Sequence, residues 1–242
     1  MVMKGSHNSK MTDALRHSRL KSLNARWPAW LALFIVALLY EALPKVFYWG
    51  PRGLMIGLVT LLIIPMIITN WRNNHRTARI LALSVNILIT LYIIISVSRI
   101  VFAALEGQIG PKHLLISSII LWGTNILVFA LWYWNLDAGG PSKRELKEQG
   151  GISAFLFPQM QISLSQHSDI PNLIKNWAPN FVDYLFLAFN TSTAFSPTDT
   201  PILTRWAKCM SMVQAIISLT IILMLAARAI NILNPASSYF VS

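Results

Sequence analysis

The chain has 242 residues, of which 55% are hydrophobic and only 12% are charged, and its mean hydropathy is +0.53. Soluble globular domains carry about 25% charged residues, so this composition excludes most soluble folds. The net charge of +11 does not indicate nucleic-acid binding, because the basic residues stand in short polar segments beside apolar runs and form no stripe interleaved with aromatic residues.

Predominantly apolar runs of about 20 residues, the length that crosses a bilayer, recur along the chain. Residues 1–26 are polar and basic, and the first apolar run begins directly after them. We therefore expect a basic cytoplasmic tail at 1–26 and a four-helix transmembrane region at 27–134, with helices at 27–43, 53–71, 78–104 and 113–134.

The chain becomes more polar after this region. Residues 135–178 form a long loop, and the apolar stretch 152–164 within it is too short to cross a membrane, which predicts an interfacial segment. Residues 179–242 contain a short apolar helix at 181–192, a polar turn and a long final span at 205–233. The sequence thus predicts an all-α, polytopic helical membrane protein with five transmembrane helices and one re-entrant or interfacial hairpin.

The basic residues are distributed unequally across the predicted membrane. The side that holds the tail has 15 lysines and arginines, and the other side has 3, namely Lys45, Arg52 and Lys112. Because basic loops stay in the cytoplasm, we expect a cytoplasmic amino terminus in a bacterial-type inner (plasma) membrane. The partner expected for the basic loops is a lipid bilayer with anionic headgroups.

Three charged residues, Glu41, Arg99 and Arg228, lie within or at the end of predicted spans. A charge at membrane depth costs about 2.5 to 3.5 kcal/mol and normally faces a partner or water. Two interpretations stay open. Either the three residues form an intramembrane charge cluster, or each side chain extends to the outer headgroups.

Four uncharged polar residues also lie inside predicted spans: Asn86, Asn125, Gln214 and Ser218. Gln214 and Ser218 are four residues apart and therefore share one face of a helix. Such residues either join neighbouring helices by hydrogen bonds or line a conduction pathway, and the sequence leaves both open.

The segment at residues 182–199 reads VDYLFLAFNTSTAFSPTD. This aromatic-rich helix and polar run resembles the pore helix and TTVGYGD-like filter of two-transmembrane potassium channel pore domains, and the span at 205–233 is similar to their inner helix. The resemblance covers about the last 60 residues. It implies ion transport, a homo-oligomer (a tetramer if the hairpins form a pore), and a filter-like segment made by Thr193, Ala194, Phe195, Ser196, Pro197, Thr198 and Asp199.

The filter-like segment departs from the family at several positions. Ser196 and Thr198 replace the two glycines of the family filter, and Pro197 replaces its aromatic residue. Because glycine's freedom at positive φ lets successive carbonyls point at the ion, we do not expect a potassium-selective filter. The family's pore loops also enter from outside, whereas the charge distribution places this hairpin on the cytoplasmic side.

The sequence supports two functional hypotheses. The first is a channel-like protein that conducts ions through a degenerate, non-potassium-selective filter. The alternative is a non-conducting membrane scaffold or sensor that keeps the hairpin as a structural element and works through its cytoplasmic tail and loop. We expect no enzyme activity, cofactor or metal, because no catalytic motif occurs and the five histidines show no metal-ligand spacing.

Overall fold

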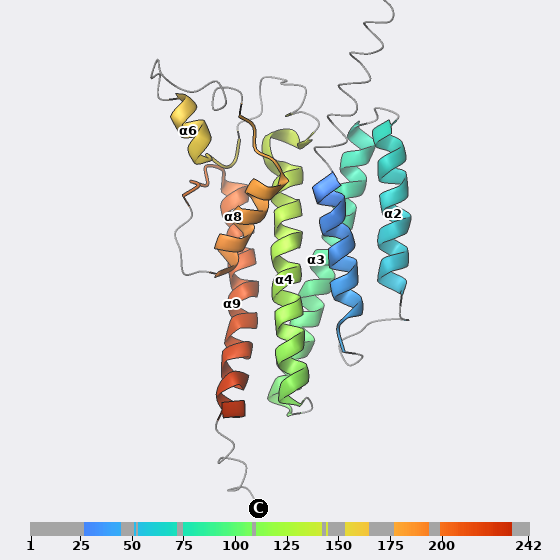
Figure 1. Ribbon diagram of the computed structural model, residues 1–242, viewed down its shortest axis with the longest axis vertical. Coiled ribbons are helices and arrows are strands. Elements are labelled where there is room, and N and C mark those ends of the chain that lie inside the picture. The colour runs from blue at the N-terminus through green and yellow to red at the C-terminus, as the bar shows by residue number, and fades with distance from the viewer. Residues whose placement is uncertain are drawn as a thin grey trace, which may run out of the picture.

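The computed structural model describes residues 27–44, 51, 53–71, 75–107, 110–141, 144, 153–164, 177–193 and 199–233. These residues are mostly helical (Figure 1). Apart from one antiparallel bridge between Phe155 and Ile202, they contain no β-structure. The all-α fold expected from the sequence is therefore confirmed for this part of the chain.

The helices lie close to their expected positions. A helix at Trp27–Glu41, drawn in blue in Figure 1, precedes the labelled elements. These are α2 (Leu54–Trp71), α3 (His75–Leu105), α4 (Pro111–Leu136), the 3-10 turn η2 (Asp137–Gly139), α6 (Pro158–Leu164), α8 (Phe181–Thr193) and α9 (Arg205–Leu233). Both α3 and α4 extend a few residues beyond the apolar runs, because polar residues at a helix end continue the backbone hydrogen bonding.

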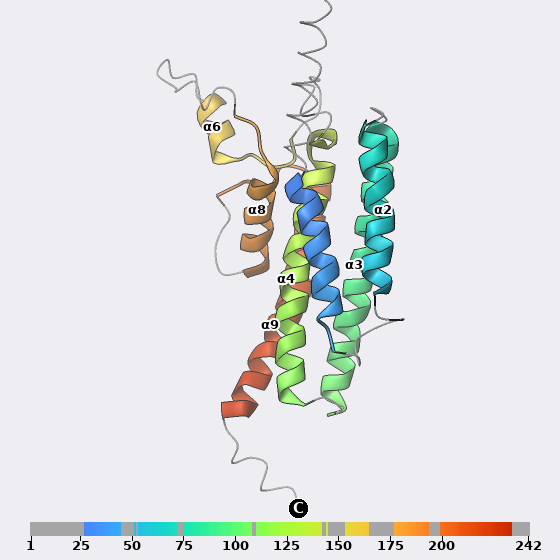
Figure 2. The ribbon, with the colours of Figure 1, turned by 45° about the vertical axis from the view of Figure 1, so that its right-hand side comes forward.

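Three helices, α3, α4 and α9, are long and apolar enough to cross a membrane. The Trp27–Glu41 helix and α2 are also apolar and run alongside them, as Figures 1 and 2 show. The Trp27–Glu41 helix, α2, α3 and α4 alternate in direction along the chain. Helix α9 runs opposite to α4. The described part of the chain is therefore a bundle of roughly aligned, alternating apolar helices.

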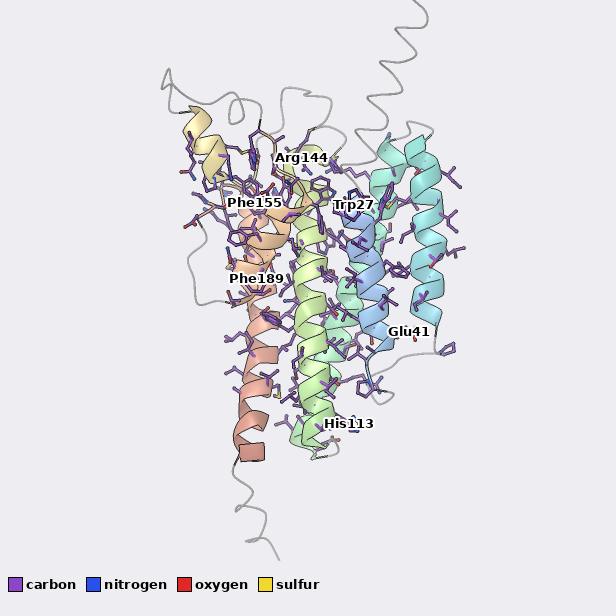
Figure 3. All side chains as sticks on the ribbon, in the orientation of Figure 1. Trp27, Glu41, His113, Arg144, Phe155 and Phe189 are labelled. Carbon is purple, nitrogen blue, oxygen red and sulfur yellow. The ribbon has the colours of Figure 1, made fainter. Side chains whose placement is uncertain are left out.

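This alternation brings the basic helix ends to one end of the bundle. Figure 3 places Trp27 and Arg144 at this end, and Glu41 and His113 toward the opposite end. Helices α3 and α9 both begin at the end that holds Trp27 and Arg144. This end therefore also carries the basic residues of their first turns: Arg76, Arg79, Arg205 and Lys208. We call it the basic end.

The central helix of the bundle is α4. It packs against α3 on one side and against α8 and α9 on the other. Of the three long helices it is the most buried. Leu114, Leu121 and Val128 are buried along it at intervals of seven residues, two helical turns, which keeps them on one face.

The short helix α8 has one buried and one exposed face. Tyr184, Leu187 and Ala188 are buried against its neighbours α4 and α9, while Val182 and Phe186 are exposed. At about 1.5 Å per residue, the 13 residues of α8 extend about 20 Å and the 29 residues of α9 about 44 Å. Figure 2 accordingly shows α8 ending part-way along the bundle.

The segment expected to be interfacial divides into two parts. Residues 153–157 are extended, and only α6, which begins at Pro158, is helical. The extended part pairs with the segment before α9, since the Leu156 N–H donates to Pro201 O at 3.0 Å and the Leu203 N–H donates to Ala154 O at 2.8 Å. Proline fits the first turn of α6 because the backbone N–H that it lacks has no helical partner there.

Aromatic side chains fill the space between these segments at the basic end. Phe155 is fully buried, with ring centroids 5.0 Å from Tyr133, 6.1 Å from Tyr184 and 6.1 Å from Trp206. These partners belong to α4, α8 and α9, so one ring connects three helices. Ring contacts join nine described residues into this aromatic cluster: Phe129, Tyr133, Trp134, Phe155, Phe157, Trp177, Phe181, Tyr184 and Trp206.

We predict that Phe155→Ala lowers the free energy of unfolding by about 3 kcal/mol, because it leaves a cavity where three helices meet. Ile162→Ala, at an exposed position on α6, is the matched control and should change it by less than about 0.5 kcal/mol. Equilibrium unfolding in mixed micelles measures both. Equal effects would show that the aromatic cluster does not hold these helices together.

Candidate functional site

The first buried polar cluster surrounds Asp137, which directly follows α4. One carboxylate oxygen accepts the Ala154 N–H at 2.6 Å, and the other accepts the Tyr184 hydroxyl at 2.6 Å. The Ser153 hydroxyl lies 3.2 and 3.1 Å from the two oxygens. The carboxylate therefore connects the end of α4 to the extended segment and to the first turn of α8.

A sharp backbone turn directs Asp137 inward. Ala138, Gly139 and Gly140 have φ values of 48°, 81° and 94°, and the Gly140 N–H donates to Asp137 O at 2.8 Å. A Cβ on Gly140 would lie 3.0 Å from Asn135 O, so both the positive φ and the close approach require glycine there. The local sequence thus ends α4 and turns the backbone sharply directly after it.

Arg144 folds back over this turn. Its two terminal nitrogens donate to Trp134 O at 2.9 Å and to Asp137 O at 2.6 Å. Its guanidinium lies 4.5 Å from the ring centroid of Trp134 and 5.1 Å from that of Tyr184. We call the two carbonyls and two rings the Arg144 seat.

The Tyr184 hydroxyl is a buried proton donor to Asp137. Burial of the phenol raises the pKa of Tyr184 well above its ordinary value; the nearby Arg144 charge opposes this rise and the Asp137 charge reinforces it. A tyrosine hydroxyl is protonated at physiological pH even at its ordinary pKa, and here its proton is donated to the Asp137 carboxylate.

The second cluster surrounds Gln214, deeper in the bundle. Its amide oxygen accepts the Tyr133 hydroxyl at 2.6 Å, and its amide nitrogen donates to Ala188 O and to Ser192 Oγ, both at 2.7 Å. The side chain is fully buried. One glutamine thus connects α9 to α4 and to the last turns of α8.

Asn125 and Ser218 extend the Gln214 cluster by one more turn. The Asn125 amide nitrogen donates to Ser218 Oγ at 2.8 Å and more weakly to Gln214 O at 3.3 Å. Three of the four polar residues predicted from the sequence therefore meet at the α4–α9 contact. Both Asn125 and Ser218 are fully buried, so they join helices in this chain.

Asn86, the fourth predicted polar residue, takes no part in the Gln214 cluster. It is buried on α3, and its backbone carbonyl accepts the Thr90 hydroxyl at 2.6 Å. Thr90 Oγ1 in turn accepts the Trp132 indole N–H at 2.8 Å. The hydrogen bond between Thr90 and Trp132 connects α3 to α4. Within the described residues, the Asn86 amide nitrogen has no hydrogen-bond partner.

Only the two ends of the filter-like segment are described. Thr193 is the last residue of α8, and its hydroxyl donates to Asn190 O at 3.0 Å. Asp199 is exposed on the return toward α9. Ala194, Phe195, Ser196, Pro197 and Thr198 lie outside the described residues.

The predicted charge cluster is described only in part. Glu41 Oε1 accepts the Gly53 N–H at 2.9 Å, which ties the end of the first helix to the start of α2. The Arg99 side chain is exposed on α3. The Arg228 side chain lies outside the described residues, so the cluster stays a prediction.

The sequence reasoning missed the residues around Asp137. The sequence placed Asp137 and Arg144 only within the long loop at 135–178 and Tyr184 only within an aromatic-rich helix. One signal was present. A carboxylate at a helix C-terminus opposes the helix macrodipole and so requires nearby donors.

No chemistry beyond hydrogen bonding and cation binding is evident in these clusters. Among the described residues, no group of three histidine, cysteine, aspartate or glutamate side chains could hold a metal ion. Neither a protein-family model, nor a curated protein, nor a solved structure matches the chain. The resemblance to potassium channel pore domains therefore rests on the sequence of about the last 60 residues alone.

We predict that Asp137→Asn destabilises the protein by about 2 kcal/mol, because an amide nitrogen would face donors that now bond to a carboxylate. Asp199→Asn, at an exposed position, is the control and should have little effect. Limited proteolysis between α6 and α8, together with thermal unfolding, measures the loss. A variant as resistant as the native chain would disprove the role of Asp137 in holding the hairpin.

We predict that Gln214→Leu costs about 2 kcal/mol, since it removes three interhelical hydrogen bonds worth roughly 0.6 kcal/mol each within a membrane. Thr220→Val on the same helix is the matched control, because its hydroxyl donates within its own helix, to the Ile216 carbonyl one turn earlier. Unfolding by sodium dodecyl sulfate in mixed micelles compares the two. A control as unstable as the Gln214 variant would contradict the prediction.

Proposed function

We propose that this chain is an integral membrane protein with five membrane-crossing helices, with its amino terminus and basic end in the cytoplasm of a bacterial-type inner membrane. The three long apolar helices and the two apolar helices beside them support the five spans. The one-sided distribution of lysine and arginine supports the orientation. Anionic headgroups are the partner that the basic end fits best.

We further propose that residues 181–204 form a re-entrant hairpin. Tyr184, near the start of α8, bonds to Asp137 at the basic end, and Leu203, just before α9, pairs with Ala154 beside the same carboxylate. Between these points α8 reaches the depth of Gln214, ten residues into α9. The chain thus enters and leaves this region at the same end of the bundle.

The function that this geometry supports best is a non-conducting membrane scaffold or sensor, in which the hairpin is a structural element. The observation that carries this proposal is the saturation of Gln214, whose amide nitrogen and oxygen are both used in hydrogen bonds inside one chain. A conduction pathway needs polar groups that face water or ions. A cavity between α3, α4 and α9 has a volume of only about 10 Å³, room for one water molecule.

A channel-like homo-oligomer is the second candidate. It is favoured by one feature, the short helix α8 that ends part-way along α9 before the chain returns to the basic end. Irregular backbone at membrane depth survives where it is buried in protein or lines a cavity. In a tetramer, residues 193–199 would surround the common axis.

The scaffold proposal predicts no ion flux. We expect purified protein in proteoliposomes to pass potassium, sodium, chloride and protons at the rate of empty vesicles, at any protein density, while vesicles with a known ionophore serve as the positive control. Flux above background that disappears in Ser196→Leu or Thr198→Leu would reject the scaffold and establish the channel. Flux insensitive to both substitutions would reflect leakage.

A further inference from the structure

The Arg144 seat has the properties of a cation-binding site in its own right. The last carbonyls of a helix have no helical N–H partner and form the negative end of its macrodipole. The Trp134 carbonyl in the last turn of α4 and the Asp137 carbonyl directly after it, which also accepts the Gly140 N–H, both accept the guanidinium, and two aromatic ring centroids lie 4.5 and 5.1 Å from its carbon. Four independent features of the seat therefore favour a positive charge.

The geometry favours a guanidinium over an ammonium ion. The two acceptor carbonyls belong to residues three apart, and each receives a different nitrogen of one planar group, at 2.9 and 2.6 Å. The guanidinium carbon also lies 4.5 and 5.1 Å from the centroids of the Trp134 and Tyr184 rings, whose planes are 75° apart, so the group can lie flat on one ring at most. An ammonium ion is a compact point charge and lacks the rigid fork of donors that reaches both carbonyls while stacking on a ring.

The seat is built by residues other than Arg144. Trp134 belongs to the end of α4, Asp137 directly follows it, and Tyr184 belongs to α8; all three are buried. Asp137 is fixed by Ala154 and Tyr184, independently of Arg144. Arg144 itself is only partly buried, so the seat is reached from the basic end of the bundle.

We propose that the Arg144 seat is a preformed guanidinium-binding site, which Arg144 fills from within the chain. Its ligand class is a guanidinium group, either on a small molecule or on another arginine, which would exchange with Arg144. Through Tyr184, occupancy of the site is coupled to the position of α8. This proposal does not depend on whether the protein conducts ions.

Chemical rescue tests the proposal. Arg144→Ala empties the site and should lower the midpoint of thermal unfolding by several degrees. Methylguanidinium at about 10 mM should restore at least half of this loss in the variant, with saturation, and should leave the native chain unchanged. Methylammonium at the same concentration matches its charge and ionic strength, and should restore little.

Several outcomes would overturn the proposal. These are no response of the variant, an equal response to methylammonium, or an equal response of the native chain.

Adding Trp134→Leu to Arg144→Ala should abolish the rescue, because one of the two rings is lost. If Arg144→Ala is not recovered folded, Arg144→Gln replaces it. If neither folds, recovery of folded protein only in methylguanidinium supports the site, and no recovery in any buffer rejects it.

Discussion

The hydrogen-bonded carboxylate of Asp137 is the constraint on which the hairpin depends. A buried carboxylate without donors is costly, and at a helix C-terminus the macrodipole adds to the cost. Its donors come from outside α4: the Ser153 hydroxyl and the Ala154 N–H from the extended segment, and the Tyr184 hydroxyl from α8. Because the carboxylate is satisfied only when both segments are in place, α4, the extended segment and α8 are ordered together.

Gln214 provides the second point of attachment, at depth. A short helix that ends inside the bundle leaves carbonyl groups and polar side chains away from water, which a membrane does not tolerate unless partners exist. The Gln214 amide bonds to Ala188 O and Ser192 Oγ, near the end of α8, and accepts the Tyr133 hydroxyl from α4. Both ends of α8 are therefore held by buried polar groups, and the aromatic cluster fills the space at the basic end.

This arrangement changes the meaning of the pore-like sequence. A pore helix in a channel supports a filter of flexible backbone, for which glycine is needed, whereas Ser196 and Thr198 occupy those positions here. Of the polar residues that were candidates for a pathway, Gln214, Asn125 and Ser218 form hydrogen bonds between helices of one chain. The basic end is then the surface through which a scaffold or sensor would act, and Arg144 connects that surface to α8 through Tyr184.

The sequence by itself determined the helices, because apolar runs of membrane length leave the backbone few alternatives to intrahelical hydrogen bonds. It also predicted that Asn125, Gln214 and Ser218 either join helices or line a pathway, since polar groups at membrane depth require partners. Only the tertiary structure decided which partners they have, and it alone revealed the clusters of Asp137 and Arg144. These clusters join residues 7 to 47 positions apart in sequence, and no local pattern encodes such pairings.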